Sequence, residues 1–446
     1  MQGVDPRVER HGTCIFVLLK AYFLRRLLLI PFTLIGITLL VFAIVRLTPG
    51  GPVEQALSRM MGEGGKRSRA EAGFSLTPSQ VLEIEEEYGR DKGIMRSYLE
   101  WLGAAPMDTR KVSSEFPKGK DEVKIALPGS IDEVTVTNDG GRAKLTAEEG
   151  IDLTGWEARI VSPQEQAERW KRWVKGGALP VMPEPRAVLY QPRYEGLLQG
   201  GLGYSRKYQD SVWEMILDRM PVSLAFGGVS MLLIYGICLP LGIVKAIRHR
   251  SWLDSLSSVA VFAGYAVPGY ALGALMVVYL AAKLRWFPLG GFVGDNFESL
   301  SLLGQVKDLA HHMALPLLCY LVGSFAMMTM LMKNNLMDNL AADYVRTAIA
   351  KGTGFRTAVF RHAFRNSIIP IATTFGANLM IFVTGSVLIE KVFDINGFGL
   401  LSFSSILEFD EPVIMGVLFV SATLMLLGNV VSDLCVALVD PRVSYK

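Results

Sequence analysis

The feature that most limits the possible folds is a series of long apolar runs. The first, Leu27–Val45, has 19 residues and no charge, and a helix of about 20 residues crosses the core of a bilayer. Half of the 446 residues are hydrophobic and only 20% are charged. We therefore predict an all-α polytopic membrane protein with six transmembrane helices. The five later runs are Val222–Val244, Val259–Ala282, Met313–Met332, Ile368–Ile389 and Val413–Val431, the last continuing to Val439.

The charges of the connections predict the side of the membrane that each one faces. From Lys333 to Arg365 the chain carries six Lys and Arg against two acids, and Lys245–Asp254 carries three cations and one acid. By contrast, Ile389–Glu411 carries one cation and five acids. Because cytoplasmic connections are enriched in Lys and Arg, this pattern places both termini in the cytoplasm. The net charge of +3 is too small to indicate nucleic acid as a partner.

The N-terminal stretch is basic and precedes the first run. That run is longer than the apolar core of a signal peptide, and no cleavage site of small residues precedes Pro49. We therefore predict an uncleaved first transmembrane helix at residues 23–47. Residues 1–22 are predicted to be a cytoplasmic extension, with a short helix around Ile15–Leu19.

A polar region, residues 48–215, separates the first two runs and is far longer than an ordinary loop. Asn138–Gly141 reads Asn-Asp-Gly-Gly, which predicts a hairpin turn between strands. Ser162–Glu165 has the pattern of a helix N-cap with Pro at the first position, and Gly176 would end that helix. We predict a β-rich extracytoplasmic domain with one helix inserted here, at residues 104–195. Its strands are expected at Val123–Leu127, Glu133–Thr137, Ala143–Ala147 and Glu157–Val161.

Three tryptophans of this region, Trp156, Trp170 and Trp173, suit either a ligand site or a core. Large apolar rings are buried in most small domains, so core packing is the favoured interpretation.

The sequence contains no evident nucleotide-binding motif and almost no ionisable group within the apolar runs. Gly62–Lys66 lacks both the spacing and the Ser or Thr of a phosphate-binding loop. The apolar runs hold no carboxylate except Asp433, whereas ion-coupled carriers keep ionisable groups at mid-membrane. The four cysteines have no metal-binding or disulfide spacing, and His311-His312 fits a helix end better than a metal site. We therefore predict that the chain is not an enzyme and receives energy from a partner.

Glycines and prolines interrupt the apolar runs. Such residues allow helices to approach closely or to bend, which a pathway with alternating access requires. Ordinary packing of membrane helices explains any single one equally well. They are Gly264, Pro268, Gly269, Gly273, Pro316, Gly323, Gly376 and Gly385.

The basic connection at residues 339–370 has the pattern of two helices separated by a turn. Good helix formers run from Leu340 to Lys351, and Gly352 stands where a left-handed cap would end that helix. A second helix is predicted from about Arg356, with cations along one side. Pro370 then falls near the start of the next apolar run.

Three segments carry a resemblance to a known family. YVRTAIAKG (Tyr344–Gly352), RHAFRNSIIP (Arg361–Pro370) and VSDLCVALVDPRVSY (Val431–Tyr445) resemble the membrane permease subunits of bacterial dipeptide and oligopeptide ABC importers. The Yej-type permeases for microcin C and oligopeptides are nearest. General importers have Glu-Ala-Ala where this chain has Arg-Thr-Ala, a difference typical of the peptide subgroup. Leu76–Gly103 and Leu197–Ile216 also resemble family segments, and the insert between them is not covered.

The resemblance implies specific roles for two segments. Residues 339–370 would form a coupling loop that docks in a groove of a separate ATPase, and Glu390–Leu401 would lie at the outer mouth of the pathway. There, Gly397 and Gly399 would let the backbone turn tightly. The coupling-loop residues implied by position are Arg346, Thr347, Ala348 and Gly352, supported by Arg361, His362, Asn366 and Pro370, and the outer-gate residues are Gly385, Glu390, Gly397 and Gly399.

The function implied is a permease subunit of an ATP-driven peptide importer in the bacterial inner membrane, with residues 216–446 as a five-helix core. Its partners would be a second homologous permease, two ATP-binding subunits that hold ATP and Mg²⁺, a periplasmic solute-binding protein and membrane lipid. This chain itself would hold no cofactor. Two alternatives remain: the same machinery importing nickel or another small solute, and a membrane-anchored receptor or scaffold whose insert is the working part. Substitution of Ala348 and Gly352 would separate a transporter from a receptor.

Overall fold

A computed structural model describes residues 6–49, 51, 53–55, 78–148, 150–173 and 182–439. The chain divides into two compact units, which we describe separately. The helical unit comprises Met1–Thr38, Glu214–Leu407 and Gly416–Lys446, and the mixed unit comprises Leu39–Trp213 and Glu408–Met415. Both Gly62–Lys66 and the predicted helix end at Gly176 lie outside the described residues.

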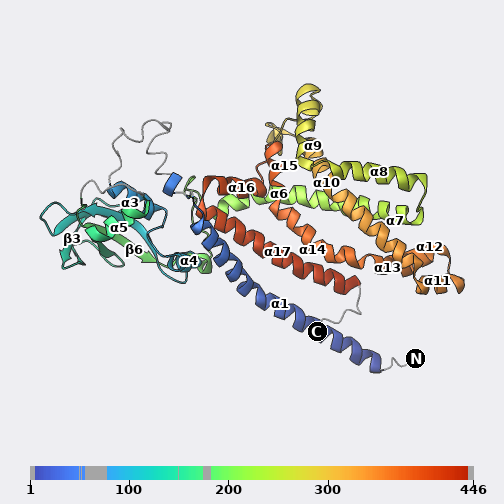
Figure 1. Cartoon of the computed structure of the whole chain (residues 1–446), viewed down its shortest axis with the longest axis horizontal. Coiled ribbons are helices and arrows are strands. Elements are labelled where there is room, and N and C mark those ends of the chain that lie inside the picture. Colours follow the sequence, from blue (N-terminus) through green and yellow to red (C-terminus); the bar gives the residue numbers. More distant parts are fainter. Residues whose placement is uncertain are drawn as a thin grey trace. The chain divides into compact units, whose positions relative to one another are not determined.

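The helical unit confirms the expectation of several long apolar helices (Figure 1). Among the described residues, four helices are long and apolar enough to cross a membrane: Ala21–Leu47, Val212–Ile247, Leu302–Ala341 and Glu411–Val439. A bent pair of helices makes five if it counts as one span. The elements are α1 (Pro6–Leu47), α6 (Val212–Leu233), η2 (Ile234–Cys238), α7 (Leu239–Ile247), α8 (Trp252–Ala266), α9 (Gly269–Met276), η3 (Val277–Lys283), η4 (Phe297–Ser299), α10 (Leu302–Ala341), α11 (Asp343–Ala350), α12 (Phe355–Thr357), η5 (Ala358–Ala363), α13 (Phe364–Ser367), α14 (Ile369–Thr384), α15 (Val387–Val392), α16 (Phe398–Glu408) and α17 (Glu411–Val439).

Helix α1 differs from the prediction because it is continuous. It begins at Pro6 and ends at Leu47, so no separate short helix forms around Ile15–Leu19. The Tyr22 hydroxyl donates to Asp433 of α17 at 3.0 Å, and Arg26 forms an ion pair with the same carboxylate. The one acid noted in the last apolar run is therefore neutralised by α1.

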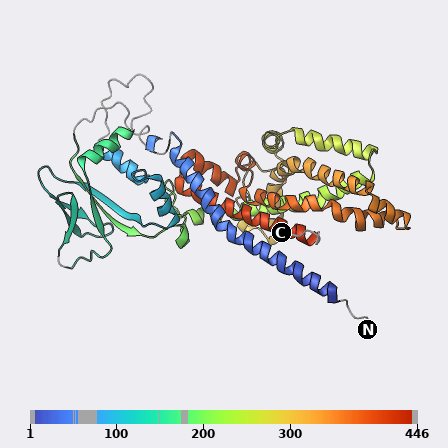
Figure 2. The same cartoon turned by 60° about the horizontal axis from the view of Figure 1, so that its bottom comes forward.

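The third apolar run was predicted as one transmembrane helix, but the structure divides it into two helices that are bent against each other. Helix α8 ends before Val267-Pro268, and α9 leaves at 87° to it (Figures 1 and 2). Val267 has the extended conformation, with ψ 121°, that a residue before proline favours. Proline also lacks the N–H that would continue the helix, so the bend has a local cause.

The fifth apolar run is also interrupted. Helix α14 has 16 residues and ends at Thr384, and Gly385 follows with a φ of +56°. A positive φ costs an L-residue energy that glycine does not lose, so the chain turns here and resumes as α15 at Val387. The run predicted as Ile368–Ile389 therefore spans two helices.

Helix α10 lies at the centre of the helical unit, beside α7, α8, α9 and α14 (Figure 1). It contributes to two separate clusters of buried apolar side chains. Met332 and Leu336 belong to one with Cys238, and Met313 and Tyr320 belong to the other. Its N-terminus is capped by the Ser301 hydroxyl, which accepts the N–H of Gly304 at 3.4 Å.

The mixed unit contains the predicted β-rich insert, as two antiparallel three-stranded sheets. Their strand orders are β1-β6-β5 and β2-β3-β4. Helices α3 and α5 pack on each other (Figure 1). The elements are α3 (Pro78–Glu87), α4 (Ile94–Leu102), β1 (Met107–Glu115), β2 (Glu122–Ala126), β3 (Glu133–Asp139), β4 (Arg142–Ala147), β5 (Glu157–Val161), α5 (Pro163–Trp173), β6 (Arg186–Arg193) and η1 (Leu197–Gln199).

The local predictions for this unit are confirmed where a few neighbouring residues decide the structure. The β3–β4 hairpin turns at Gly140 and Gly141, which both have positive φ. The Ser162 hydroxyl accepts the N–H of Glu165 at 3.2 Å and caps α5. Strands β1 and β6 were not predicted from the sequence, although β6 is the central strand of its sheet. The first four residues of β6 are all buried. The strand therefore lacks the alternation of apolar and polar residues by which a strand is recognised in a sequence.

Of the three tryptophans, Trp170 is the one most clearly packed in a core. Trp170 is buried against Val81 and Ile84 of α3, as favoured from the sequence. Beside it, Arg169 forms ion pairs with Glu85 at 2.6 Å and Glu86 at 3.0 Å. Helix α5 is thus held on α3 by both apolar contact and charge.

Candidate functional site

The 339–370 segment begins with a break in the backbone. Ala342 is extended, with ψ 147°, so α10 ends at Ala341 and α11 starts at Asp343. The predicted helix from Leu340 is wrong at its start, because Leu340 still belongs to α10. Asp343 lies in the first turn of α11, where a negative charge favours the positive end of the helix dipole.

The other end of α11 confirms the predicted glycine cap. Gly352 has a φ of +90° and donates its N–H to Ile349 O at 2.9 Å. Thr353 donates to Ala348 O at 3.1 Å. These two bonds form a Schellman motif, which satisfies carbonyls that the helix leaves without partners. The length of α11 is therefore set by Gly352.

Helix α11 is held by one face only. Val345 is fully buried in a cluster with Met332 and Leu336 of α10 and Val359 of η5. The opposite face is open to solvent, with Thr347 and Ala350 exposed there, and Ile349, one turn after Val345, is itself 41% exposed. A short helix that is anchored on one side and bare on the other can receive a partner without a change of conformation.

Two hydroxyl-centred contacts fasten this segment to α10. The Tyr344 hydroxyl donates to Asn339 Oδ1 at 2.6 Å and accepts from Asn366 Nδ2 at 3.0 Å. The Ser367 hydroxyl donates to Asn335 O at 3.1 Å. These bonds therefore link helices α10, α11 and α13 to one another.

The structure brings the predicted coupling residues into one segment but gives them different environments. Arg346 and Arg361 have no ion-pair partner among the described residues. Both side chains are exposed, so their charges are free for another molecule. The full set divides into exposed Arg346, Thr347, Gly352, Arg361 and Asn366, and half-buried Ala348, His362 and Pro370.

The four predicted outer-gate residues meet around one carboxylate. Glu390 is 2% exposed, and its Oε2 accepts the N–H of Leu400 at 2.7 Å near the start of α16. Gly399 also donates its N–H to this carboxylate. A Cβ on Gly397 would lie 2.7 Å from Glu390 Cδ, and one on Gly385 would overlap Glu390 Oε1. Glu390 thus acts as a remote N-cap for α16.

One expectation about these glycines is corrected. Gly397 and Gly399 were expected to permit a tight turn, but the positive φ belongs to Gly385. Gly397 is needed instead for close approach, because a side chain there would meet Glu390 and the Ser223 hydroxyl. Burial raises the pKa of Glu390 to about 7, against the lowering effect of the two backbone N–H groups.

Replacing Glu390 by alanine is expected to lower the free energy of unfolding by about 2 kcal/mol, since two N–H groups lose their acceptor. Glu390→Gln retains an acceptor and should cost about half as much. The thermal unfolding midpoint of the purified protein measures both changes. Glu298→Ala, at an exposed acid of η4, is the control. Equal midpoints for Glu390→Ala and the control would contradict the capping role.

The sequence analysis missed a buried ion cluster beside the 339–370 segment. Lys333 Nζ lies 2.7 and 2.8 Å from the two oxygens of Asp254, and Lys245 Nζ lies 3.0 Å from Oδ1. Lys245 also donates to the hydroxyls of Ser257 and Ser258 at 2.7 and 2.8 Å. The cluster joins α7, α8 and α10.

In the sequence these charges serve only as indicators of topology. Asp254 is 5% exposed, so it is a buried anion between two buried cations. The one sequence signal is Ser251 three residues before it, and the Ser251 hydroxyl does accept the Asp254 N–H at 3.4 Å. The lysines carry no such signal, because their partner lies on another helix.

The two neighbouring histidines contact backbone carbonyls. Among the described residues, no three His, Cys, Asp or Glu side chains could hold a metal ion together. His311 Nε2 contacts Trp286 O at 2.8 Å, and His312 Nδ1 contacts Asp308 O at 2.9 Å. Each ring is thus paired with a backbone carbonyl.

The chain is similar to inner membrane proteins of transport systems. Residues 238–445 match the family described as binding-protein-dependent transport system inner membrane component. The chain is 30% identical to the inner membrane ABC transporter permease protein YejB of Escherichia coli O157:H7, over 96% of this chain and 99% of that protein. It is 29% identical to the peptidoglycan transport system permease protein YejB of Agrobacterium fabrum (strain C58 / ATCC 33970), over 96% and 98%.

A third relative matches a shorter part of this chain than the two YejB proteins do. The oligopeptide transport system permease protein AppB of Bacillus subtilis (strain 168) is 34% identical, but over 59% of this chain and 82% of its own length. The matches to both YejB proteins extend over nearly the full length of both chains. Both relatives are therefore long enough to contain a comparable insert. The chain belongs to the family of inner membrane permeases of binding-protein-dependent ABC transport systems.

Proposed function

We propose that this chain is a transmembrane permease subunit of an ATP-driven importer that carries peptides across the bacterial inner membrane. The names of its relatives support this cargo class, since they include peptidoglycan, oligopeptide and di/tripeptide transport permeases. The long apolar helices of the helical unit supply the membrane-embedded part.

We also propose a topology of six spans with both termini in the cytoplasm. Four long helices, the α8–α9 pair and α14 make up the six. The charge pattern supports this orientation, because the 339–370 segment is basic whereas Ile389–Glu411 is acidic. The insert at residues 104–195 then faces the periplasm.

The energy for transport would come from contact with a separate ATPase. The observation that carries this proposal is the bare outer face of α11, whose inner face is anchored by Val345. The ATPase would have to hold α11 differently before and after nucleotide binding, because otherwise ATP could not bias the permease. The assembly would contain two ATPases with ATP and Mg²⁺, a second permease and a periplasmic solute-binding protein.

A charge placed on the exposed apolar side chain of α11 tests this coupling. Ile349→Asp is expected to reduce peptide uptake by the assembled transporter about tenfold, because a carboxylate would be buried against the ATPase. The α11 fold should survive, since Ile349 is 41% exposed. Uptake of a labelled tripeptide and co-purification of the ATPase are the measurements.

The matched control is Ile131→Asp, at a side chain that is 99% exposed in the insert. It adds the same charge far along the chain and should leave uptake unchanged. If Ile349→Asp transports normally and retains the ATPase, α11 is not the coupling helix. If deletion of residues 104–195 alone removes the biological effect while uptake persists, the receptor interpretation replaces the transporter.

A further inference from the structure

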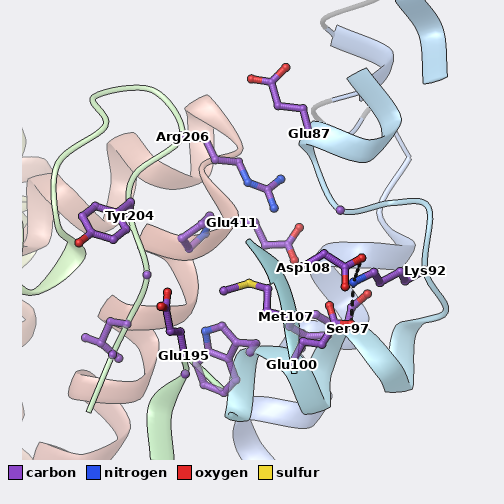
Figure 3. Close-up of a pocket in the computed structure, with 18 of the residues that line it drawn as sticks. Glu87, Lys92, Ser97, Glu100, Met107, Asp108, Glu195, Tyr204, Arg206 and Glu411 are labelled. Atoms are coloured by element: carbon purple, nitrogen blue, oxygen red, sulfur yellow. Dashed lines mark hydrogen bonds and ion pairs between the residues drawn. The ribbon is translucent and has the colours of Figure 1, made fainter. Parts of the chain in front are cut away.

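The mixed unit contains a cavity that the coupling mechanism does not use. Its volume is about 530 Å³, within the range of about 300–1,000 Å³ typical of small-molecule sites. Figure 3 shows side chains from several elements converging on it. They come from the end of α1, from α3 and the loop after it, from α4, from the start of β1, from the segments on both sides of η1 and from the first residues of α17.

Two polar atoms in the wall of this cavity lack hydrogen-bond partners among the described residues. Ser97 is 6% exposed, yet its hydroxyl forms no hydrogen bond within the described part of the chain. The indole N–H of Trp101 is likewise unpaired there. These residues are four positions apart on α4 and so share one face of the helix. Buried polar groups are almost always satisfied, so an unpaired hydroxyl at a cavity indicates a missing hydrogen-bond partner.

One wall of the cavity carries an available cation. Arg206 donates to Tyr88 O at 2.9 Å, but among the described residues no carboxylate lies within 4.0 Å of its guanidinium. Arg46 is different, because its Nε is bound to Glu411 at 3.0 Å. Burial lowers the pKa of Arg206, the Glu411 carboxylate opposes this effect in part, and the nearby Arg46 charge adds to it. An anion placed beside Arg206 would relieve both costs.

Other parts of the lining carry excess negative charge. Lys92 forms ion pairs with both Glu100 at 2.7 Å and Asp108 at 3.0 Å, and Glu100 has a second cationic partner in Arg96 at 3.2 Å, whereas Asp108 shares Lys92. Glu195 has a single ion-pair partner among the described residues, Arg193 at 3.5 Å, and that pair is about half exposed. A cationic group in the cavity would therefore find carboxylates that are only partly neutralised.

We propose that this cavity binds a short zwitterionic peptide, with its carboxylate on Arg206, its ammonium group by Glu195 and its amide groups on Ser97 and Trp101. A simple anion or cation would use one charged wall and leave the unpaired hydroxyl and indole unused. A peptide of two or three residues has both charges, amide donors and acceptors, and a suitable size. The proposal rests on the proposed peptide transport and adds a subsite outside the helical unit.

The test uses purified full-length protein and the peptide Ala-Ala-Ala, with calorimetry as the measurement. Saturable binding is expected, and N-acetylation or C-terminal amidation of the peptide should each weaken it about tenfold by removing one charge. Because these probes leave the protein unchanged, misfolding cannot produce the effect. Equal affinity for the free and doubly capped peptides, or no saturable binding, would overturn the proposal.

Variants assign the ends of the peptide. Glu195→Gln, at an exposed side chain, should weaken Ala-Ala-Ala about tenfold but leave N-acetyl-Ala-Ala-Ala unaffected. Arg206→Gln should weaken Ala-Ala-Ala about tenfold but leave the C-terminally amidated peptide unaffected, and Ser97→Ala should weaken Ala-Ala-Ala and N-acetyl-Ala-Ala-Ala about threefold. Glu133→Gln, an exposed acid of β3, is the control and should change nothing. Wild-type affinity in the Glu195 and Arg206 variants would refute the assignment.

Uptake by the complete transporter separates this proposal from the proposed function. If peptides are imported but the purified chain binds none, the cavity proposal fails and the transport function stands. If the intact transporter imports no peptide, the proposed function fails, whatever the cavity binds.

Discussion

Asp254→Ala is expected to lower the free energy of unfolding by about 3 kcal/mol, because removing one member of a buried ion pair leaves its partner uncompensated. Two cations are affected here, Lys245 and Lys333, whose side chains are 2% and 11% exposed. Without the carboxylate they would also repel each other.

Thermal unfolding of the purified protein measures this loss, and a second substitution tests its cause. Adding Lys333→Met to Asp254→Ala removes one stranded charge and should recover about half of the lost stability. Asp295→Ala, at an exposed acid, is the control. The explanation is wrong if Asp254→Ala is no more harmful than this control, or if Lys333→Met adds a further loss.

Function should respond to the same substitution. The cluster joins α7 and α8 to α10, and α10 leads directly into α11. If the cluster positions α11 for an ATPase, Asp254→Ala at low temperature, where the protein remains folded, should reduce uptake more than binding of the partner permease.

Gly376→Leu is expected to separate α14 from α17 and to cost about 3 kcal/mol, the upper part of the usual range for overpacking. A Cβ at Gly376 would lie 2.8 Å from the Gly428 carbonyl carbon and 2.8 Å from Ser432 Cβ, and nearer still to the Gly428 oxygen. Backbone atoms cannot rotate away as a flexible side chain can. Small residues on both helices allow this close contact. Dispersion forces stabilise it, and the Ser432 hydroxyl donates to Ala372 O and Thr373 O at 2.9 Å.

The control for this prediction lies in a neighbouring helix of the same kind. A Cβ added at Gly323 of α10 would meet no neighbouring atom within 4 Å, so Gly323→Leu should change stability little. The sequence marks both glycines as points where helices could approach closely, and only the structure distinguishes them. Yield of folded protein and its thermal midpoint in detergent are the measurements. Equal losses for the two variants would show that the α14–α17 contact is not close in solution.

The comparison of these two glycines illustrates a general division. Sequence analysis correctly predicted the Gly352 cap, the Ser162 cap and the turn at Gly140 and Gly141. Each depends on bonds between residues no more than about five positions apart, so the residues that decide the structure are adjacent in the sequence. The apolar runs were equally readable, because the length of a membrane-spanning helix is a local property.

The predictions from sequence were wrong where the effect of a proline or glycine depends on neighbours that only the fold supplies. The third apolar run contains Pro268, which marks a point where the helix could bend but does not reveal a turn of 87°. The sequence also marks Gly397 and Gly399 as turn residues, yet the positive φ belongs to Gly385. Which glycine turns and which one packs depends on where Glu390 lies, and Glu390 is placed by the fold.

By itself, the sequence determined the number of apolar runs, the helix caps, most strands of the insert and the family to which the chain belongs. The tertiary structure alone decided which charges are buried together: Asp254 with Lys245 and Lys333, and Glu390 with the start of α16. It also decided which glycines touch backbone and that Ser97 faces a cavity. The physical reason is that a buried charge or a close contact has its energy from a partner on another helix, and packing selects that partner.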